Sequence, residues 1–133
     1  MLVLRDPALA SRIANSEIRS LVTQRFAEVC AGEVYNYDEH GYMIVVEPGD
    51  SVEALEQESS LPILRNLFDE VTFPNPEFSP TYEALEEHHG CYEILFITTD
   101  SGFGITFFIP KEAGIDASLL AMCAEYASPA ISR

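Results

Sequence analysis

Two neighbouring segments in the second half of the chain are almost continuously apolar, and they limit the folds that this sequence can adopt. Cys91–Thr99 and Phe103–Pro110 have the composition of strands, and residues 100–102 between them have the composition of a hairpin turn. A strand with one solvated face alternates between apolar and polar residues, whereas these two segments show little alternation. The sequence therefore predicts a hairpin at the centre of a sheet, covered on both faces.

A second hairpin is predicted nearer the N-terminus. Glu33–Tyr37 and Tyr42–Glu47 alternate and are rich in Tyr, Val and Ile, with a turn at residues 38–41. Residues 61–64 are expected to form a short strand, at an edge of the sheet because Pro62 lacks a backbone N–H. Residues 66–79, which contain two prolines, are expected to form a long loop.

Helices are predicted where a capping residue precedes apolar residues at helical spacing. They are expected from residue 15 or 16 to Gly32, from Asp50 to about Ser59, from Ser79-Pro80 to Gly90, and from Asp116 through Tyr126. Asp6-Pro7 is expected to open a short helical turn before the first of them. The sequence thus predicts one α+β domain over residues 1–133, with residues 1–15 as a loosely attached segment. Its sheet is expected to be mostly antiparallel, built from two hairpins with about four helices packed on it.

The charge of the chain is strongly one-sided. The sequence holds 22 acidic and 7 basic residues, which gives a formal charge of -15. Residues 26–64 and 66–110 contain no Lys or Arg at all. A surface of this sign repels nucleic acid phosphates and anionic membranes, so neither is expected as a direct partner. It attracts a protein partner with a basic surface.

The cysteines and the absence of export signals predict a cytoplasmic protein. Cys30, Cys91 and Cys123 are an odd number of thiols in apolar surroundings, which is typical of buried free cysteines rather than of a disulfide framework. The apolar stretch at the start of the sequence is too short for a secretory signal. No segment approaches the roughly 20 apolar residues of a membrane helix.

Motifs for bound cofactors are missing from the sequence. Neither phosphate-binding loop, G-x-x-x-x-G-K-[ST] or G-x-G-x-x-G, occurs, and neither do G-x-S-x-G, H-E-x-x-H or C-x-x-C. No cofactor is therefore expected. The candidate for chemistry is the cluster His88-His89-Gly90-Cys91, in which imidazole and thiol are possible zinc ligands or catalytic groups. Together with His40, this cluster is the basis of the alternative hypothesis, a small metal-dependent or cysteine/histidine enzyme.

The leading hypothesis is that the protein works by binding another protein and has no chemistry of its own. Acidic residues on the predicted helices and aromatic residues in the loop between them form the expected partner surface. That surface comprises Glu53, Glu56, Phe68, Asp69, Glu70, Phe73, Phe78, Glu83, Glu86 and Glu87. Such a protein is either an immunity or antitoxin protein that blocks a basic cleft, or a DNA mimic whose carboxylate rows imitate phosphates. A sheet face that the helices leave exposed would make it a homodimer.

Overall fold

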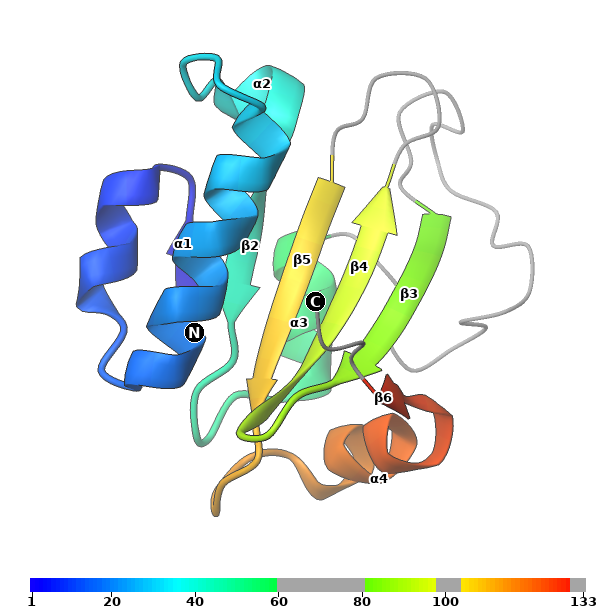
Figure 1. Cartoon of the computed structure of the whole chain (residues 1–133). Helices are drawn as coiled ribbons and strands as arrows, with labels where there is room; N and C mark the ends of the chain where they lie inside the picture. Colours follow the sequence, from blue (N-terminus) through cyan, green and yellow to red (C-terminus); the bar gives the residue numbers. More distant parts are fainter. Residues whose placement is uncertain (60–80, 98–103, 130–133) are drawn as a thin grey trace.

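The computed structural model describes residues 1–59, 81–97 and 104–129, and it shows an α+β fold (Figure 1). The strands form one mixed sheet in the order β1-β2-β5-β4-β3-β6. Their bounds are β1 Leu2–Leu4, β2 Gly41–Val45, β3 Thr81–Glu87, β4 Cys91–Ile97, β5 Gly104–Pro110 and β6 Ser128–Pro129. The helices are α1 Ser16–Cys30, α2 Tyr37–His40, α3 Val52–Ser59 and α4 Ala117–Tyr126, with a 3₁₀ helix, η1, at Pro7–Arg12.

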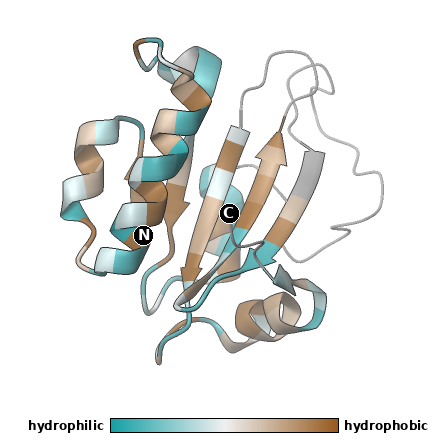
Figure 2. Cartoon of the chain, in the orientation of Figure 1, coloured by the Kyte–Doolittle hydropathy of each residue, from teal (hydrophilic) through white to brown (hydrophobic). Residues whose placement is uncertain are grey.

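The predicted central hairpin is confirmed. β4 and β5 pair in antiparallel fashion, with Ile94 opposite Phe107, and they occupy the middle of the sheet. Hydrophobic residues make up most of both strands (Figure 2). Neighbouring residues of a strand point to opposite faces, so Ile94 and Phe107 enter one core while Cys91 and Phe108 enter another.

Helices cover the two faces of the sheet unequally (Figure 1). On the back face, α3 and α4 bury Val52, Leu55 and Leu119 against β2, β5 and β4. On the front face, α1 and η1 bury Val22, Phe26 and the residues around them against β1, β2 and part of β5. Among the described helices, α1 lies over the β2 and β5 side of the front face (Figure 1). The front faces of β4 and β3 are therefore where a site can form.

Most predicted helix starts are confirmed by their caps. The side chains of Asp6, Asn15 and Asp116 accept hydrogen bonds from backbone N–H groups in the first turns of η1, α1 and α4. At α3 the helix is confirmed but the capping residue is different. The Ser51 hydroxyl accepts from the Ala54 N–H, while the Asp50 carboxylate accepts from the Glu47 N–H and so stabilises the preceding turn.

The predicted hairpin over residues 33–47 is wrong. Its first half forms no strand: residues 37–40 form α2, and β2 begins directly after it at Gly41. β2 pairs in parallel with β5 and in antiparallel fashion with β1. The sheet is consequently mixed rather than mostly antiparallel, and it is not built from two hairpins.

The predicted helix over residues 80–89 is also wrong. Thr81–Glu87 is the strand β3, which pairs with β4 in antiparallel fashion through a tight turn at residues 88–91. A shift in register between Tyr82 and Ala84 interrupts the alternation of side chains along β3. The predicted strand at 61–64 and the predicted loop at 66–79 lie outside the described residues.

Residues 1–15, expected to be loosely attached, pair and pack with the rest of the described fold. Leu2 to Leu4 pair with β2, and Leu4, Ala10 and Ile13 are buried in the front core. Of the helices in the described ranges, none has the length and apolar character that crossing a bilayer requires.

Candidate functional site

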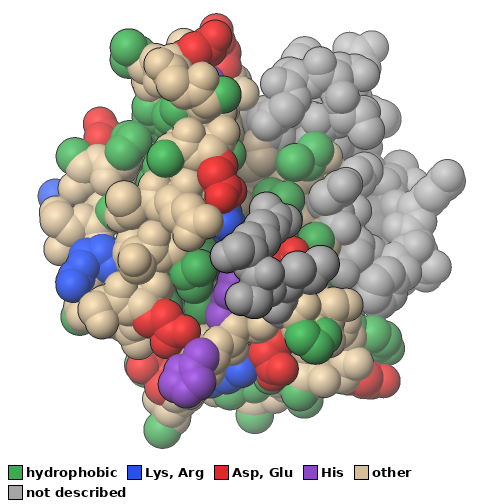
Figure 3. Space-filling view, viewed as in Figure 1, with side chains coloured by type: hydrophobic (Ala, Val, Ile, Leu, Met, Phe, Trp, Pro, Cys, Tyr) green, Lys and Arg blue, Asp and Glu red, His purple; other side chains and the backbone are tan. Residues whose placement is uncertain are grey.

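A cavity of about 490 Å³ lies between α1 and the front face of the sheet. Ala84, Leu95, Ile97, Gly104 and Thr106 contribute to its floor from β3, β4 and β5. Its wall on α1 includes Leu21, Gln24, Arg25, Glu28 and Val29. This volume falls in the range of about 300–1,000 Å³ that is common for ligand sites. We refer to it as the front cavity; Figure 3 shows acidic, basic and histidine side chains gathered in the hollow beside α1.

The most strongly bonded group in the front cavity is the pair of Arg25 on α1 and Glu93 on β4. Arg25 Nε and Nη2 donate to the two Glu93 oxygens at 2.6 and 2.8 Å, and its Nη1 donates to Glu28 at 3.2 Å. Glu93 is 6% exposed. Burial alone would raise the pKa of Glu93, but the hydrogen bonds from Arg25 and His88 and the charge of Arg25 outweigh it and keep the pKa low. Glu93 is therefore ionised near neutral pH.

His88 is the second donor to Glu93. Its Nε2 lies 2.8 Å from Glu93 Oε1, and an ionised carboxylate is only an acceptor, so Nε2 carries a proton. The backbone carbonyl of His88 accepts from Lys111 Nζ at 2.7 Å, which helps to hold the turn after β3. His88 Nε2 is consequently not a free ligand for a metal ion.

Glu86 lies beside this group, and no cation of the described residues pairs with it. It stands directly opposite Glu93 across the β3–β4 pair, and like charges at that position repel. Glu86, His88 and Glu93 each have one polar atom within 4.8 Å of the others, as a metal site would require. Glu86 is half-buried, and within the described residues it accepts no hydrogen bond. The cavity thus contains a carboxylate that is available to a ligand.

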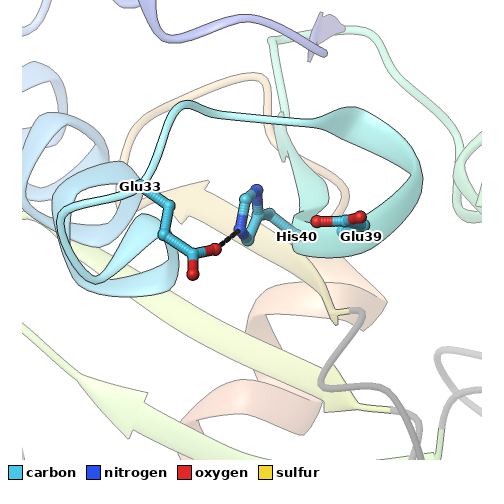
Figure 4. A group of neighbouring side chains, drawn as sticks. All are labelled: Glu33, Glu39 and His40. Atoms are coloured by element: carbon cyan, nitrogen blue, oxygen red, sulfur yellow. Dashed lines mark ion pairs between the residues drawn. The ribbon is translucent and has the colours of Figure 1, made fainter.

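A second group with metal-ligand chemistry surrounds His40, in which Glu33 and Glu39 lie on either side of the imidazole (Figure 4). The Asn36 N–H donates to His40 Nδ1 at 2.8 Å, which places the proton of a neutral ring on Nε2. That nitrogen lies 3.8 Å from Glu33. Nδ1 is thus occupied by a hydrogen bond, and the neutral ring presents a protonated nitrogen, Nε2, to the two carboxylates.

The predicted cluster of His88, His89 and Cys91 does not converge on one point. His88 lines the front cavity, whereas the His89 side chain is 95% exposed and lies 3.5 Å from Glu17. Cys91 is fully buried in the front core. The backbone places these three residues in a tight turn and a strand, where consecutive side chains diverge.

The buried thiols are predicted to be unreactive. Burial raises the pKa of both Cys91 and Cys123 to about 12, so at pH 8 only about one thiol in 10,000 is a thiolate at either position. Cys30 is partly exposed.

With iodoacetamide at pH 8, we expect mass spectrometry of peptides to find alkylation at Cys30 alone in the folded protein and at all three cysteines in urea. Alkylation of folded Cys91 as fast as Cys30 would contradict this expectation.

The acidic residues predicted to bind a partner lie on different sides of the sheet. Glu53 is exposed on α3, on the back face, and one Glu56 oxygen is buried without a hydrogen-bond partner among the described residues. Glu86 faces the front cavity, while its neighbour Glu87 is exposed and accepts from Lys111. The Glu83 side chain lies outside the described part of the chain, as do Phe68, Asp69, Glu70, Phe73 and Phe78.

Arg25 and Glu93 were not recognised from the sequence as site residues, although one signal was present. Glu93 is the only charged residue between Cys91 and Ile97, in a segment whose other residues indicate burial. A buried carboxylate requires a cation, and basic residues are few in this chain. The arginines of the first helix were therefore the candidates for its partner.

Comparisons of the chain with protein-family models, with curated proteins and with solved structures find no match.

Proposed function

We propose that the protein binds a basic protein partner and that the front cavity is the centre of the contact. The observation that supports this is the charge of the cavity. Among its described lining residues are three carboxylates, Glu28, Glu86 and Glu93, and one guanidinium, Arg25. A concave surface with an excess of one charge attracts the opposite charge more strongly than a flat surface does.

The remaining cations of the described chain do not offset this excess. Arg5 pairs with Glu58, Lys111 pairs with Glu87, and Arg19 donates to the carbonyl of Ile13. Arg12 is exposed on η1. These four side chains all lie outside the lining of the front cavity. The negative potential in the cavity therefore remains available to a partner.

Blocking of a basic cleft, as by an immunity or antitoxin protein, is favoured over DNA mimicry. Mimicry was inferred from carboxylates spaced along two predicted helices. The helix over residues 52–59 forms, but residues 81–90 are strand and turn, so one of the two carboxylate rows is absent. Glu86 and Glu87 are neighbours on β3, so their carboxylates point to opposite faces instead of forming one row. A cavity that receives a basic side chain fits the inhibitor form better.

The proposal includes a cytoplasmic setting. All three cysteines are free, as is usual in a reducing compartment. If the front cavity instead joins two copies of this chain, light scattering will find a homodimer that the charge substitutions below disrupt.

The test is capture of partners from an extract of the source cells, with the full chain as bait at about 0.1 M and 0.5 M salt. The screening length falls from about 10 Å at 0.1 M to about 3 Å at 1 M, so an electrostatic partner is retained only at the lower salt. We expect the bait with Glu28→Gln and Glu86→Gln to lose that partner and the bait with Glu125→Gln, an exposed residue of α4, to retain it. A partner that is insensitive to both salt and the cavity substitutions would contradict the proposal.

The second candidate is an enzyme, and one contact favours it. The hydrogen bond from His88 to Glu93 inside a cavity resembles the pairs in which a carboxylate orients a histidine for proton transfer. Within the described lining, however, Thr106 is the only hydroxyl besides that of Tyr42, and no thiol is present. Binding is therefore the function that the geometry supports best.

A further inference from the structure

We propose that the front cavity binds a primary ammonium group carried on an apolar stem, the chemistry of a lysine side chain. This rests on the proposed function, since it names the group of the basic partner that the cavity receives. Four features of the cavity lead to it: a fully occupied arginine, a protonated histidine nitrogen, a carboxylate without a partner among the described residues, and an apolar floor.

The arginine rules out an anionic ligand. Arg25 donates from all three of its nitrogens, with Nε and Nη2 on Glu93 and Nη1 on Glu28. A carboxylate or phosphate entering the cavity would have to displace one of these charge-assisted bonds, and it would also meet Glu86. The positive charge of the cavity is thus already neutralised.

The histidine argues against a metal ion. Glu86, His88 and Glu93 are close enough together to surround one, but His88 Nε2 donates its proton to Glu93. A metal ion held by His88 Nε2 would require that proton to leave. An ammonium needs no such deprotonation, because it is itself a donor and uses only an acceptor that is free among the described residues.

The Glu86 carboxylate and the apolar floor of the front cavity together favour a ligand with an ammonium group on an apolar stem. Glu86 is the acceptor that is free among the described residues, and an ammonium bound to it would offset its repulsion of Glu93 across the β3–β4 pair. Ala84, Leu95 and Ile97 lie on the same face of the sheet and offer an apolar surface to a methylene stem. A compact ammonium also approaches one carboxylate more easily than the wide, planar guanidinium.

The test uses three six-carbon probes that differ in charge: n-hexylammonium, n-hexanol and hexanoate. Binding to the full chain is followed by NMR, from the shifts of the Leu95 and Thr106 amides. We expect n-hexylammonium to bind most tightly and hexanoate not to bind. Glu86→Gln should weaken n-hexylammonium about tenfold, as expected for a charge-assisted hydrogen bond. Glu87→Gln, on the opposite face of the same strand, should have no effect.

Equal binding of all three probes, tighter binding of hexanoate, or no effect of Glu86→Gln would overturn the inference. Stabilisation by Zn²⁺ alone that Glu86→Gln abolishes would also overturn it, in favour of a metal site. If a salt-sensitive partner is captured but n-hexylammonium neither binds nor displaces it, the inference fails and the proposed function stands. If n-hexylammonium binds and no basic partner is found, the cavity chemistry stands with a free amine as its ligand, and the proposed function fails.

Discussion

Replacing Arg25 with methionine is expected to lower the free energy of unfolding by about 3–5 kcal/mol, the usual effect of removing one partner from a buried ion pair. Glu93 is 6% exposed and receives two hydrogen bonds from Arg25, so without the guanidinium its charge is left inside the protein. Urea unfolding at pH 7 measures the loss. The matched control is Arg12→Met on η1, where the side chain is exposed and the expected change is below about 0.5 kcal/mol.

A second substitution separates the cost of an unpaired charge from the loss of packing. Adding Glu93→Gln to Arg25→Met removes the buried charge and keeps an acceptor for His88, so most of the lost stability should return. If the double variant is as unstable as Arg25→Met alone, packing of the arginine stem is the dominant contribution and the expectation is wrong.

Acid provides an independent check on the same pair. Arg25 and His88 hold the pKa of Glu93 in the folded protein below its ordinary value. The ionised carboxylate therefore stabilises the fold fully above the pKa of the unfolded state, about 4.3. This stabilisation is lost as the pH falls through the lower pKa of the folded state. Arg25→Met removes the largest cause that lowers the pKa of Glu93, so the carboxylate of the variant is protonated at a higher pH and the cost of Arg25→Met should shrink steadily from neutral to acid pH. A cost that is independent of pH would show that Glu93 is not the cause.

The parts of the fold that depend on local chemistry were predictable from the sequence. Asn15 and Asp116 cap their helices through N–H groups two and three residues away, and β4 and β5, which follow each other along the chain, pair in antiparallel fashion. In each case the residues that decide the structure lie within a few positions of one another.

The errors occurred where distant pairing decides the structure. Residues 80–89 contain Glu, Ala and Leu, which favour helix, but pairing with β4 makes Thr81–Glu87 a strand. The shift in register at Tyr82 and Ala84 also removes the strict alternation that would have revealed it. Likewise, β2 takes its partner from β5, some sixty residues later, and nothing near Gly41 in the sequence indicates that parallel pair.

The candidate site was predictable only in part for the same reason. Glu86 and His88 were singled out as acidic and ligand-like residues, but their common location on a strand beside Glu93 required the β3–β4 pairing. Arg25 comes from a helix 68 residues earlier in the sequence. Its pairing with Glu93 follows from the packing of α1 on the front face, which a helical pattern does not specify.

Replacing Gly41 with alanine is expected to destabilise the protein by about 3 kcal/mol or more, because two backbones meet at this residue. A Cβ atom on Gly41 would lie 1.8 Å from the carbonyl oxygen of Gly104, its partner in the parallel β2–β5 pair. Gly41 also has a φ of 86°, which an L-residue with a side chain rarely adopts. Thermal and urea unfolding measure the effect.

Gly49→Ala is the matched control because it separates the two causes. Gly49 has a φ of 90°, but a Cβ atom there would meet nothing within 4 Å, so only the backbone strain of about 1 kcal/mol applies. Equal losses of unfolding free energy at the two positions would show that β2 and β5 can move apart with little loss of stability.

Gly41 and Gly104 both line the front cavity, so moving β2 and β5 apart would widen that cavity. Any folded Gly41→Ala protein should then bind n-hexylammonium more weakly, whereas Gly49→Ala should bind it unchanged.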